Sequence, residues 1–283
     1  MKSVLKSLFL IFALLATFAC TAQEEEEFRF SGEAVRILAI GNSFSMDAVE
    51  ENLWWLAASD GHLCEIGNLY IGGCSLERHV NNARNDAPAY QYRKVVRGVH
   101  STTNEVSLRE ALCDGKWDYI SVQQVSQLSG IYDSYQKSLP KLLGYIRLYA
   151  PQAQIVLHET WAYAADSDHS GFANYDCDQE KMYSAIVAAT TRAAHEYGIS
   201  VIIHAGTAIQ YARETTIGDN LTRDGYHLNA LGRYTAACAW YETLFGEDVR
   251  SNGYFRNNLD RNLQRTVREA AHKAVAGTNA DAE

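Results

Sequence analysis

Two turns near opposite ends of the 283-residue chain carry residue types that together can activate a hydroxyl group. The first turn, Gly41-Asn42-Ser43, follows a short apolar run, and the second contains Asp224 and His227. A serine hydroxyl is a poor nucleophile at neutral pH, so it needs a base beside it and a third group that holds this base in one tautomer. The spacing of three residues lets Asp224 accept the Nδ1 proton of His227 while Nε2 faces a nucleophile. The sequence therefore predicts a catalytic triad of Ser43, His227 and Asp224.

Acyl transfer also needs hydrogen-bond donors for the oxyanion that develops on the attacked carbonyl, each commonly worth about 3 to 4 kcal/mol. The backbone N–H of Ser43 is the first candidate donor. Gly73 is the second, because a glycine lets the backbone approach a ligand closely. A side-chain amide is expected as the third donor, and Gln123 and Gln124 both stand at the end of an apolar segment. The choice between the two glutamines stays open, with a slight preference for Gln124.

Apolar runs bounded by turn residues alternate with segments of helical period, which is typical of a parallel sheet flanked by helices. Strands are predicted at residues 35–40, 65–71, 117–123, 154–158 and 199–204. Helices are predicted at residues 48–59, 135–149, 179–197, 228–245 and 263–275. We therefore expect an α/β fold, a three-layer α/β/α sandwich around a central, mainly parallel five-stranded sheet of the flavodoxin-like type. In such sheets ligands bind beyond the carboxyl ends of the strands, where the candidate residues fall.

The first nineteen residues predict an export signal, because two lysines precede an apolar run at 8–18 that is too short to span a bilayer. Two cleavage sites stay open. Cleavage before Cys20 would give a lipoprotein at the periplasmic or outer cell surface, whereas cleavage after Ala22 would give a secreted protein. The predicted organisation is a leader at 1–19, an acidic tether at 20–33, a main domain at 34–247 and a C-terminal helical extension at 248–283.

Composition excludes several classes of function. The formal net charge of −9 does not suit nucleic-acid binding, which needs clustered lysine and arginine. The cysteines are widely spaced without a CxxC pair, so they describe neither a disulfide scaffold nor a zinc site. Residues 166–171 resemble the start of a calcium loop, yet Cys177 stands where a bidentate glutamate should close it. We therefore expect no metal and no other cofactor.

A long polar loop over the site is predicted at residues 161–178. Its aromatic residues, Trp161 and Tyr163 among them, could stack on sugar rings, or they could equally pack against the edge of the sheet. Asn42 and His158 complete the set of candidate substrate-binding residues, although a histidine at a strand end also fits a purely structural role.

The turns quoted above resemble the conserved blocks of the SGNH, or GDSL-type, hydrolase superfamily over about residues 35–247. Gly41-Asn42-Ser43 matches the first block with Asn42 in place of the usual acid, Gly73 matches the second-block glycine, and Asp224 with His227 matches the fifth block.

The third block departs from the superfamily, because Gln123-Gln124-Val125-Ser126 stands where Gly-x-Asn-Asp is expected. This replacement, together with segments 158–163 and 224–228, resembles an uncharacterised branch of SGNH-like proteins from gut Bacteroidetes.

The resemblance implies a serine esterase in which Ser43 attacks an ester carbonyl, His227 moves the proton and Asp224 orients the imidazole. With the export signal, it implies an acyl group, most readily acetyl, on a glycan or another small ester as substrate. Membrane contact is expected only through a lipid on Cys20.

Three other interpretations remain. An acyltransferase would use the same serine, and a catalytically silent carbohydrate-binding lipoprotein would account for the altered third block. An α/β-hydrolase would need the nucleophile motif G-x-S-x-G, in which Ser45 replaces the last glycine.

Overall fold

The computed structural model describes residues 30–280. The predicted leader, Cys20 and most of the predicted tether lie outside the described residues. Strand β1 begins at Ser31, inside the range predicted for the tether and four residues before the predicted start of the first strand. None of the helices in the described part of the chain combines the length and the apolar character needed to cross a bilayer.

Within residues 30–280 the sheet has seven strands, in the order β4-β3-β2-β1-β5-β6-β7. All neighbouring pairs from β2 to β7 are parallel, and the two pairs that involve β3 are antiparallel. The order of the parallel strands is that of flavodoxin-like sheets. The strands are β1 (Ser31–Gly41), β2 (His62–Tyr70), β3 (Tyr90–Val96), β4 (Val99–Val106), β5 (Tyr119–Val122), β6 (Gln154–His158) and β7 (Val201–Ile203).

The prediction of five strands is wrong, because it missed the two strands of the hairpin β3–β4. Arg97 and Gly98 join its strands, and both have positive φ angles of 51° and 72°, as the tight turns of hairpins require. Strand β4 is exposed at every residue except Val106, so its sequence lacks the alternation of apolar and polar residues by which a strand is recognised.

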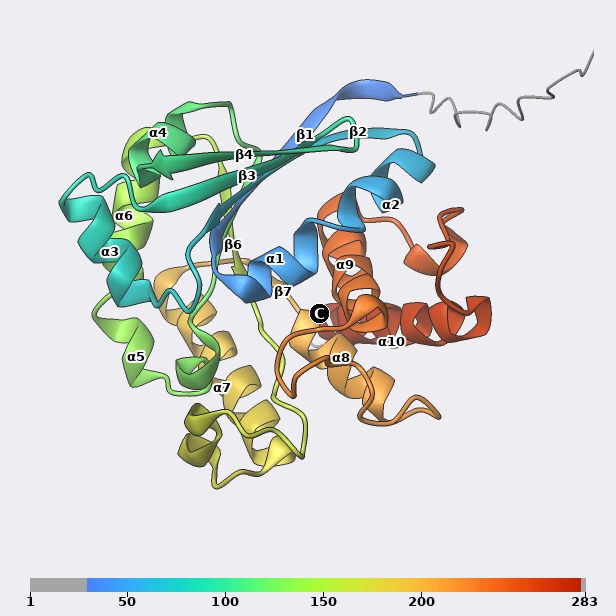
Figure 1. The fold of residues 1–283 in the computed structure, drawn as a ribbon. Coiled ribbons are helices and arrows are strands. Elements are labelled where there is room, and N and C mark those ends of the chain that lie inside the picture. The colour runs from blue at the N-terminus through green and yellow to red at the C-terminus, as the bar shows by residue number, and fades with distance from the viewer. Residues whose placement is uncertain (1–29, 281–283) are drawn as a thin grey trace, which may run out of the picture.

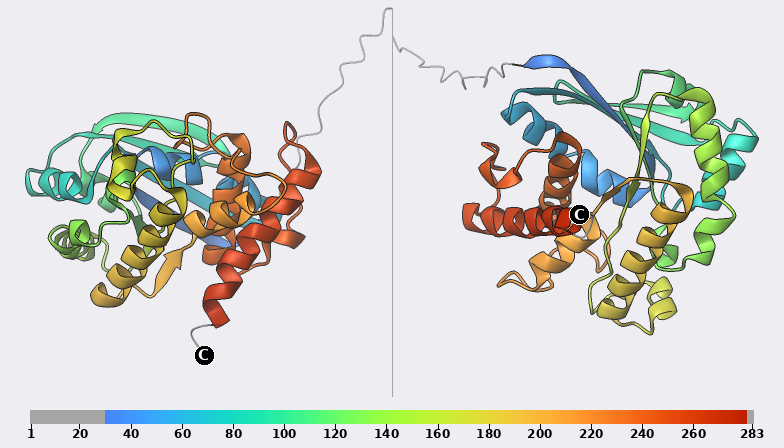
Figure 2. Two further views of the ribbon diagram at one scale, coloured as in Figure 1. Left: turned by 90° about the horizontal axis from the view of Figure 1, so that it is seen from below. Right: turned by 180° about the vertical axis from the view of Figure 1, so that it is seen from behind.

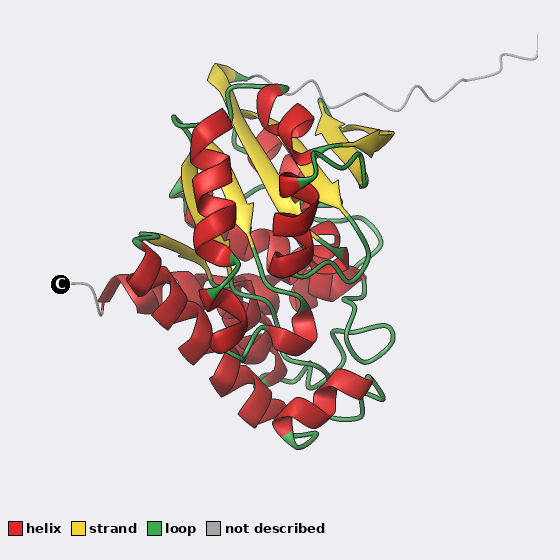
Figure 3. Cartoon of the chain, turned by 90° about the vertical axis from the view of Figure 1, so that its left-hand side faces the viewer, coloured by secondary structure: helices red, strands yellow, loops and turns green. Residues whose placement is uncertain are grey.

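Helices cover both faces of the sheet, as Figure 1 shows in ribbon form and Figure 3 by element type. One layer contains α1 (Ser43–Val49), α2 (Leu53–Ser59), α8 (Ala205–Arg213), α9 (Ala230–Phe245) and α10 (Arg261–Ala280). The other layer contains α3 (Leu76–Arg84), α4 (Leu108–Cys113) and α6 (Leu139–Tyr149), which α5 (Asp133–Gln136) precedes. Helix α7 (Gln179–Tyr197) has the predicted bounds and contributes to both cores. Three short 3₁₀ helices lie at Ser126–Leu128, Ser170–Tyr175 and Val249–Ser251.

Strand β1 shows why the three-layer arrangement follows from the sequence. Its residues Ile37 and Ala39 pack into one core and Leu38 and Ile40 into the other, each at most 1% exposed. A strand that is apolar on both faces needs helices on both sides, which is the usual condition of a parallel sheet. The three-layer fold is therefore confirmed.

The predicted C-terminal extension completes one helical layer. Helix α10 packs along α8 and α9, and Figure 2 shows this from two further directions. Val267 and Ala271 are fully buried in the same core as the sheet. Arg268 is 1% exposed, donates to the hydroxyl of Tyr234 at 2.8 Å, and lies over the ring of Phe255 at 4.0 Å. The segment is therefore an integral part of the domain.

Gly232 in α9 should be intolerant of a side chain. A Cβ atom there would lie well inside van der Waals contact of the Leu221 carbonyl oxygen, which belongs to the backbone and has little freedom to move. We expect Gly232→Ala to lower the free energy of unfolding by about 1 to 3 kcal/mol through overpacking.

Gly144→Ala is the matched control, because a Cβ atom at this exposed position in α6 would meet open space. It should stabilise the protein by up to about 1 kcal/mol through helix propensity. Denaturant unfolding of both variants measures the difference, and equal effects of the two substitutions would contradict the close approach at Gly232.

Candidate active site

The turn after β1 presents Ser43 at the first position of α1. Asn42 caps this helix, because its side-chain oxygen accepts a hydrogen bond of 2.9 Å from the N–H of Phe44. Gly41 leaves room for the turn, since a Cβ atom there would lie within 2.5 Å of the Ser45 hydroxyl. The nucleophile candidate is thus placed by a capped helix start directly at the end of the strand.

The structure brings Ser43, His227 and Asp224 into one hydrogen-bonded line. Nε2 of His227 lies 2.9 Å from the hydroxyl of Ser43, and Nδ1 of His227 lies 2.6 Å from a carboxylate oxygen of Asp224. Because Asp224 accepts the Nδ1 proton, Nε2 is the unprotonated nitrogen that can accept the hydroxyl proton of Ser43. Three groups separated by up to 184 residues in sequence therefore have the geometry of a serine-histidine-acid triad.

Asp224 is held in its ionised form. Partial burial opposes ionisation, but hydrogen bonds from the His227 ring and from the backbone N–H groups of His227 and Tyr226 outweigh it and lower the pKa of this carboxyl. An ionised carboxylate orients the imidazole and stabilises the imidazolium that forms when His227 takes up a proton.

Asp47 ties the helix of the nucleophile to the loop of the histidine. This carboxylate is 1% exposed and accepts a hydrogen bond of 2.8 Å from the N–H of Leu228, the residue after His227. Arg223 and Arg233 pair with it at 3.0 and 2.8 Å. Sequence reasoning missed Asp47, whose signal is an acidic residue one helical turn after Ser43 and so on the same face of the helix.

A pocket of about 290 Å³ opens in front of Ser43. It lies where β1 and β5 are neighbours and the strand order reverses, which is the usual ligand position in sheets of this kind. Its walls come from the segments after β1, β2 and β5 and from two later loops. The lining residues are Asn42, Ser43, Phe44, Tyr70, Gly72, Gly73, Val125, Ser126, Gln127, His169, Tyr226 and His227.

Two backbone N–H groups on the pocket wall suit an oxyanion. Ser43 and Gly73 both line the pocket, and their N–H groups have no hydrogen-bond partner within residues 30–280. Gly73 has a φ of +60°, which glycine adopts without strain, and a Cβ atom there would meet nothing within 4 Å. The structure thus places two of the predicted oxyanion donors together.

Gln124 is not available as an oxyanion donor, contrary to the sequence prediction. Its side-chain nitrogen donates both to the carbonyl and to the hydroxyl of Ser134, and its oxygen accepts from the N–H groups of Leu76 and Val125. All four bonding positions are thus used, and the residue is 2% exposed and does not line the pocket. Gln124 fastens the segment after β5 to its neighbours.

Gln123 also lies behind the pocket, in a chain of side chains that supports the nucleophile turn. Its nitrogen donates to the Asn42 side-chain oxygen at 3.0 Å, and its oxygen lies 2.8 Å from Nδ1 of His158. The Asn42 nitrogen donates in turn to the carbonyl of Cys74, next to Gly73. Although Asn42 lines the pocket, its amide is committed to holding the Ser43 and Gly73 segments together.

Three predicted substrate-binding residues are buried and do not line the pocket. Trp161 and Tyr163 are fully buried and His158 is 2% exposed. The Trp161 ring stacks on Phe44 at a centroid distance of 4.2 Å, and its N–H donates to the carbonyl of Tyr226. The prediction that these aromatic residues stack on a ligand is wrong, because both rings are packed in the core between the sheet and its helices.

The sequence did not identify several of the residues that line the pocket, among them Tyr70, Gln127, His169 and Tyr226. Tyr70 ends β2, and Gln127 follows β5 by five residues. Both positions lie at or beyond a strand end, where ligand-binding residues are expected in such sheets. His169 lies in the predicted loop over the site, between the buried aromatic residues Tyr163 and Phe172. Tyr226 directly precedes His227.

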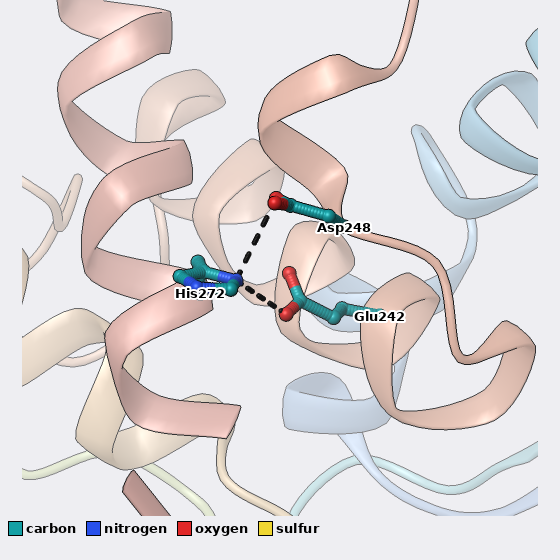
Figure 4. Close-up of side chains that lie close together, drawn as sticks. All are labelled: Glu242, Asp248 and His272. Atoms are coloured by element: carbon teal, nitrogen blue, oxygen red, sulfur yellow. Dashed lines mark hydrogen bonds and ion pairs between the residues drawn. The ribbon is translucent and has the colours of Figure 1, made fainter. Parts of the chain in front are cut away.

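Another cluster, of Glu242, Asp248 and His272, has the side-chain types of a metal site (Figure 4). Nδ1 of His272 lies 2.7 Å from Glu242 and 3.5 Å from Asp248. Arg250 pairs with Asp248, and its hydrogen bonds hold the pKa of that carboxyl at about 2. The other Glu242 oxygen accepts from the N–H of Val249. These groups already satisfy one another, and they fasten α10 to the end of α9.

The chain adopts a three-layer α/β fold around a mainly parallel sheet, and this fold matches that of SGNH hydrolases. A protein from Slackia heliotrinireducens that is provisionally named as an SGNH hydrolase matches with a TM-score of 0.52 and 21% identity, over 75% of this chain and 100% of that one. A carbohydrate esterase family 3 protein from Talaromyces cellulolyticus matches with a TM-score of 0.50 and 14% identity, over 75% of this chain and 97% of that one. At these identities the likeness concerns the fold.

The chain belongs to the DUF4886 family, a domain of unknown function, whose model matches residues 36–274. The crystal structure of a DUF4886 family protein from Bacteroides uniformis is 51% identical, with a TM-score of 0.86 over 87% of this chain and 96% of that one. No curated protein matches the chain. The family range includes most of α10, in agreement with the burial of that helix in the common core.

The hydrogen bonds of Gln124 predict a structural defect when its side chain is removed. In Gln124→Ala, the N–H groups of Leu76 and Val125 lose their buried acceptor, at about 1 to 3 kcal/mol for each group left without a partner. We expect a lower melting temperature and a kcat per folded molecule within about threefold of the parent. An oxyanion donor would instead lower kcat by about a hundredfold to a thousandfold without loss of stability. Gln91→Ala, on the exposed side of β3, is the control.

His158 predicts a pH dependence of stability. Burial lowers its pKa to about 3, whereas an unfolded histidine titrates near 6.5. Below pH 6.5 the unfolded chain takes up a proton that the folded protein does not, so stability is lost as the pH falls from 6.5 toward 3. From pH 7 to pH 5 this loss is about 2 kcal/mol. In His158→Asn, whose amide can still donate to Gln123, urea unfolding should show a correspondingly smaller loss, and an unchanged loss would refute a neutral His158.

Proposed function

We propose that this protein is a serine esterase that hydrolyses O-acyl esters, chiefly O-acetyl esters on a glycan. The observation that carries the proposal is the aligned set of Ser43, His227 and Asp224, with Ser43 and His227 on the wall of a pocket. A hydroxyl, an imidazole and a carboxylate in this order serve to form and break acyl-enzyme intermediates.

In the proposed reaction, the Ser43 oxygen attacks the ester carbonyl while Nε2 of His227 takes the hydroxyl proton. The N–H groups of Ser43 and Gly73 donate to the oxyanion of the tetrahedral intermediate. The bond to the alcohol oxygen then breaks, and His227 returns the proton to that oxygen. A water molecule attacks the acyl-enzyme in the same way, with His227 as base and then as acid, and releases the carboxylic acid and free Ser43.

The substrate class is supported by the size of the pocket and by the predicted export. About 290 Å³ lies at the small end of ligand-binding pockets, which favours a short acyl group and one ring of the alcohol. An exported enzyme meets acylated polysaccharides outside the cell, and we propose a periplasmic or cell-surface location with a lipid on Cys20. We further infer that Gln123-Gln124 replaces the third-block asparagine throughout this branch of the superfamily, with the supporting role described above.

The triad makes a sharp kinetic prediction. We expect Ser43→Ala and His227→Ala each to lower kcat on p-nitrophenyl acetate by at least about a thousandfold, because the two groups act as one unit. The double variant should lose little more than either single variant. Stopped-flow or steady-state release of p-nitrophenol measures all three.

Ser101→Ala, on the exposed strand β4, is the matched serine control and should keep the parent activity. Melting temperatures of all variants show whether any loss comes from unfolding. Equal turnover by the parent and Ser43→Ala proteins would reject the esterase proposal and leave a carbohydrate-binding role.

A further inference from the structure

His169 on the pocket wall has a defined proton arrangement. Its Nδ1 accepts a hydrogen bond of 3.0 Å from the backbone N–H of Gly171. A backbone N–H can only donate, so Nδ1 carries no proton, and the neutral ring must carry its proton on Nε2. Within residues 30–280 no group is bonded to this Nε2, and the atom is not buried. His169 therefore offers an unpartnered N–H donor at the pocket.

The surroundings of His169 keep the ring neutral. Burial, and after it the repulsion that a protonated His227 would exert, lower the pKa of His169, while Asp168 and Asp224 oppose this. The ring also packs edge-on against Tyr226, with centroids 4.8 Å apart, and lies 4.7 Å from the Tyr163 ring. The donor is thus held in place on three sides.

Gln127 offers a second donor at the same wall. Its side-chain nitrogen has no partner among the described residues, and its backbone carbonyl is fixed by Asn174 and Tyr175. Gly171 contacts both residues that carry these donors. Its N–H donates to His169, and its lack of a side chain leaves room for Gln127, whose Cβ would overlap a Cβ atom on residue 171. The same residue thus fixes the tautomer of His169 and lets Gln127 approach.

His169 is linked through Tyr226 to the histidine that the departing alcohol has to face. His227 must give its proton to the departing alcohol oxygen, so the alcohol has to lie beside Nε2 of His227. Tyr226 contacts the His227 ring at a centroid distance of 4.2 Å, and His169 contacts Tyr226. The two oxyanion N–H groups belong to Ser43 and Gly73, on the walls that follow β1 and β2.

We propose that the Nε2–H of His169 and the amide of Gln127 form a subsite that binds hydroxyl oxygens on the alcohol part of the ester. This inference rests on the proposed function and names the residues that recognise the alcohol part of its substrate, a ring that carries hydroxyl groups. An apolar alcohol would cover both donors without satisfying them, and buried groups left unpaired in this way are what gives hydrogen-bonding sites their strong discrimination.

Two acetates with the same acyl group and ring size test the subsite. Methyl 6-O-acetyl-glucopyranoside carries ring hydroxyls, and cyclohexylmethyl acetate has none. We measure kcat/KM for both and take their ratio as the selectivity. The parent protein should favour the sugar ester by about tenfold or more, in keeping with one or two hydrogen bonds.

His169→Asn removes the Nε2–H donor. It keeps an acceptor for the Gly171 N–H, since an asparagine side chain can form the same local turn. Gln127→Met removes the amide at nearly equal volume. Each variant should lower the selectivity by about threefold to tenfold, chiefly through KM for the sugar ester, with a melting temperature close to that of the parent. His169→Gln, which extends an amide toward the position of Nε2, should restore part of the selectivity.

A selectivity that stays within twofold of the parent in both His169→Asn and Gln127→Met would overturn the subsite while the esterase stands. If the parent turns over no ester at all, the proposed function fails, and binding decides the subsite alone. In that case, saturation-transfer NMR with methyl glucopyranoside should show binding that is lost in both variants. Absence of binding, or binding that both variants keep, would overturn the subsite as well.

Discussion

The carboxylate of Asp47 is the contact on which the active-site geometry depends most. It sits one turn after Ser43 on α1 and accepts the N–H of Leu228, so a single buried group sets the distance between nucleophile helix and histidine loop. Arg223 and Arg233 compensate its charge from that loop and from α9. Removing one partner of such a buried set leaves an uncompensated charge, commonly at about 3 to 5 kcal/mol. This ion pair network therefore helps to hold Ser43 and His227 in place.

The loop at residues 161–178 packs backbone to backbone against the turn that contains Gly225. Ala164 donates to the carbonyl of Gly225 at 2.7 Å, and a Cβ atom on Gly225 would lie 3.0 Å from the Cα of Ser167. Gly225 also has a φ of +83°, which a side chain would strain. The loop over the site thus braces the turn between Asp224 and His227, and its bulky rings fill the space behind. Precision at the triad comes from these close approaches.

Sequence reasoning identified the features that follow from local chemistry. The parallel strands, helix α7 and the meeting of Ser43 with His227 depend on apolar periodicity and on strand-end positions, and both are visible in one dimension. The roles of Gln124 and Trp161 depend on whether each side chain faces the pocket or the core. An amide or an aromatic ring suits either environment, so residue type alone does not decide between them. Hairpin β3–β4 escaped because its outer strand has no buried face. The role of His169 depends on the backbone N–H of Gly171, which fixes its tautomer and which the sequence does not reveal.

The outer strand of that hairpin has a consequence for how this sheet meets other protein chains. An open parallel sheet would end at β2 with a row of free backbone groups, an invitation to pair with another chain and aggregate. Here β3 pairs with β2, and β4 in turn covers β3 with hydroxyl, amide and charged side chains between His100 and Glu105. At the opposite edge β7 has three residues, too few to template a partner strand. Both edge strands of the sheet, β4 and β7, are thus poor partners for a strand of another molecule.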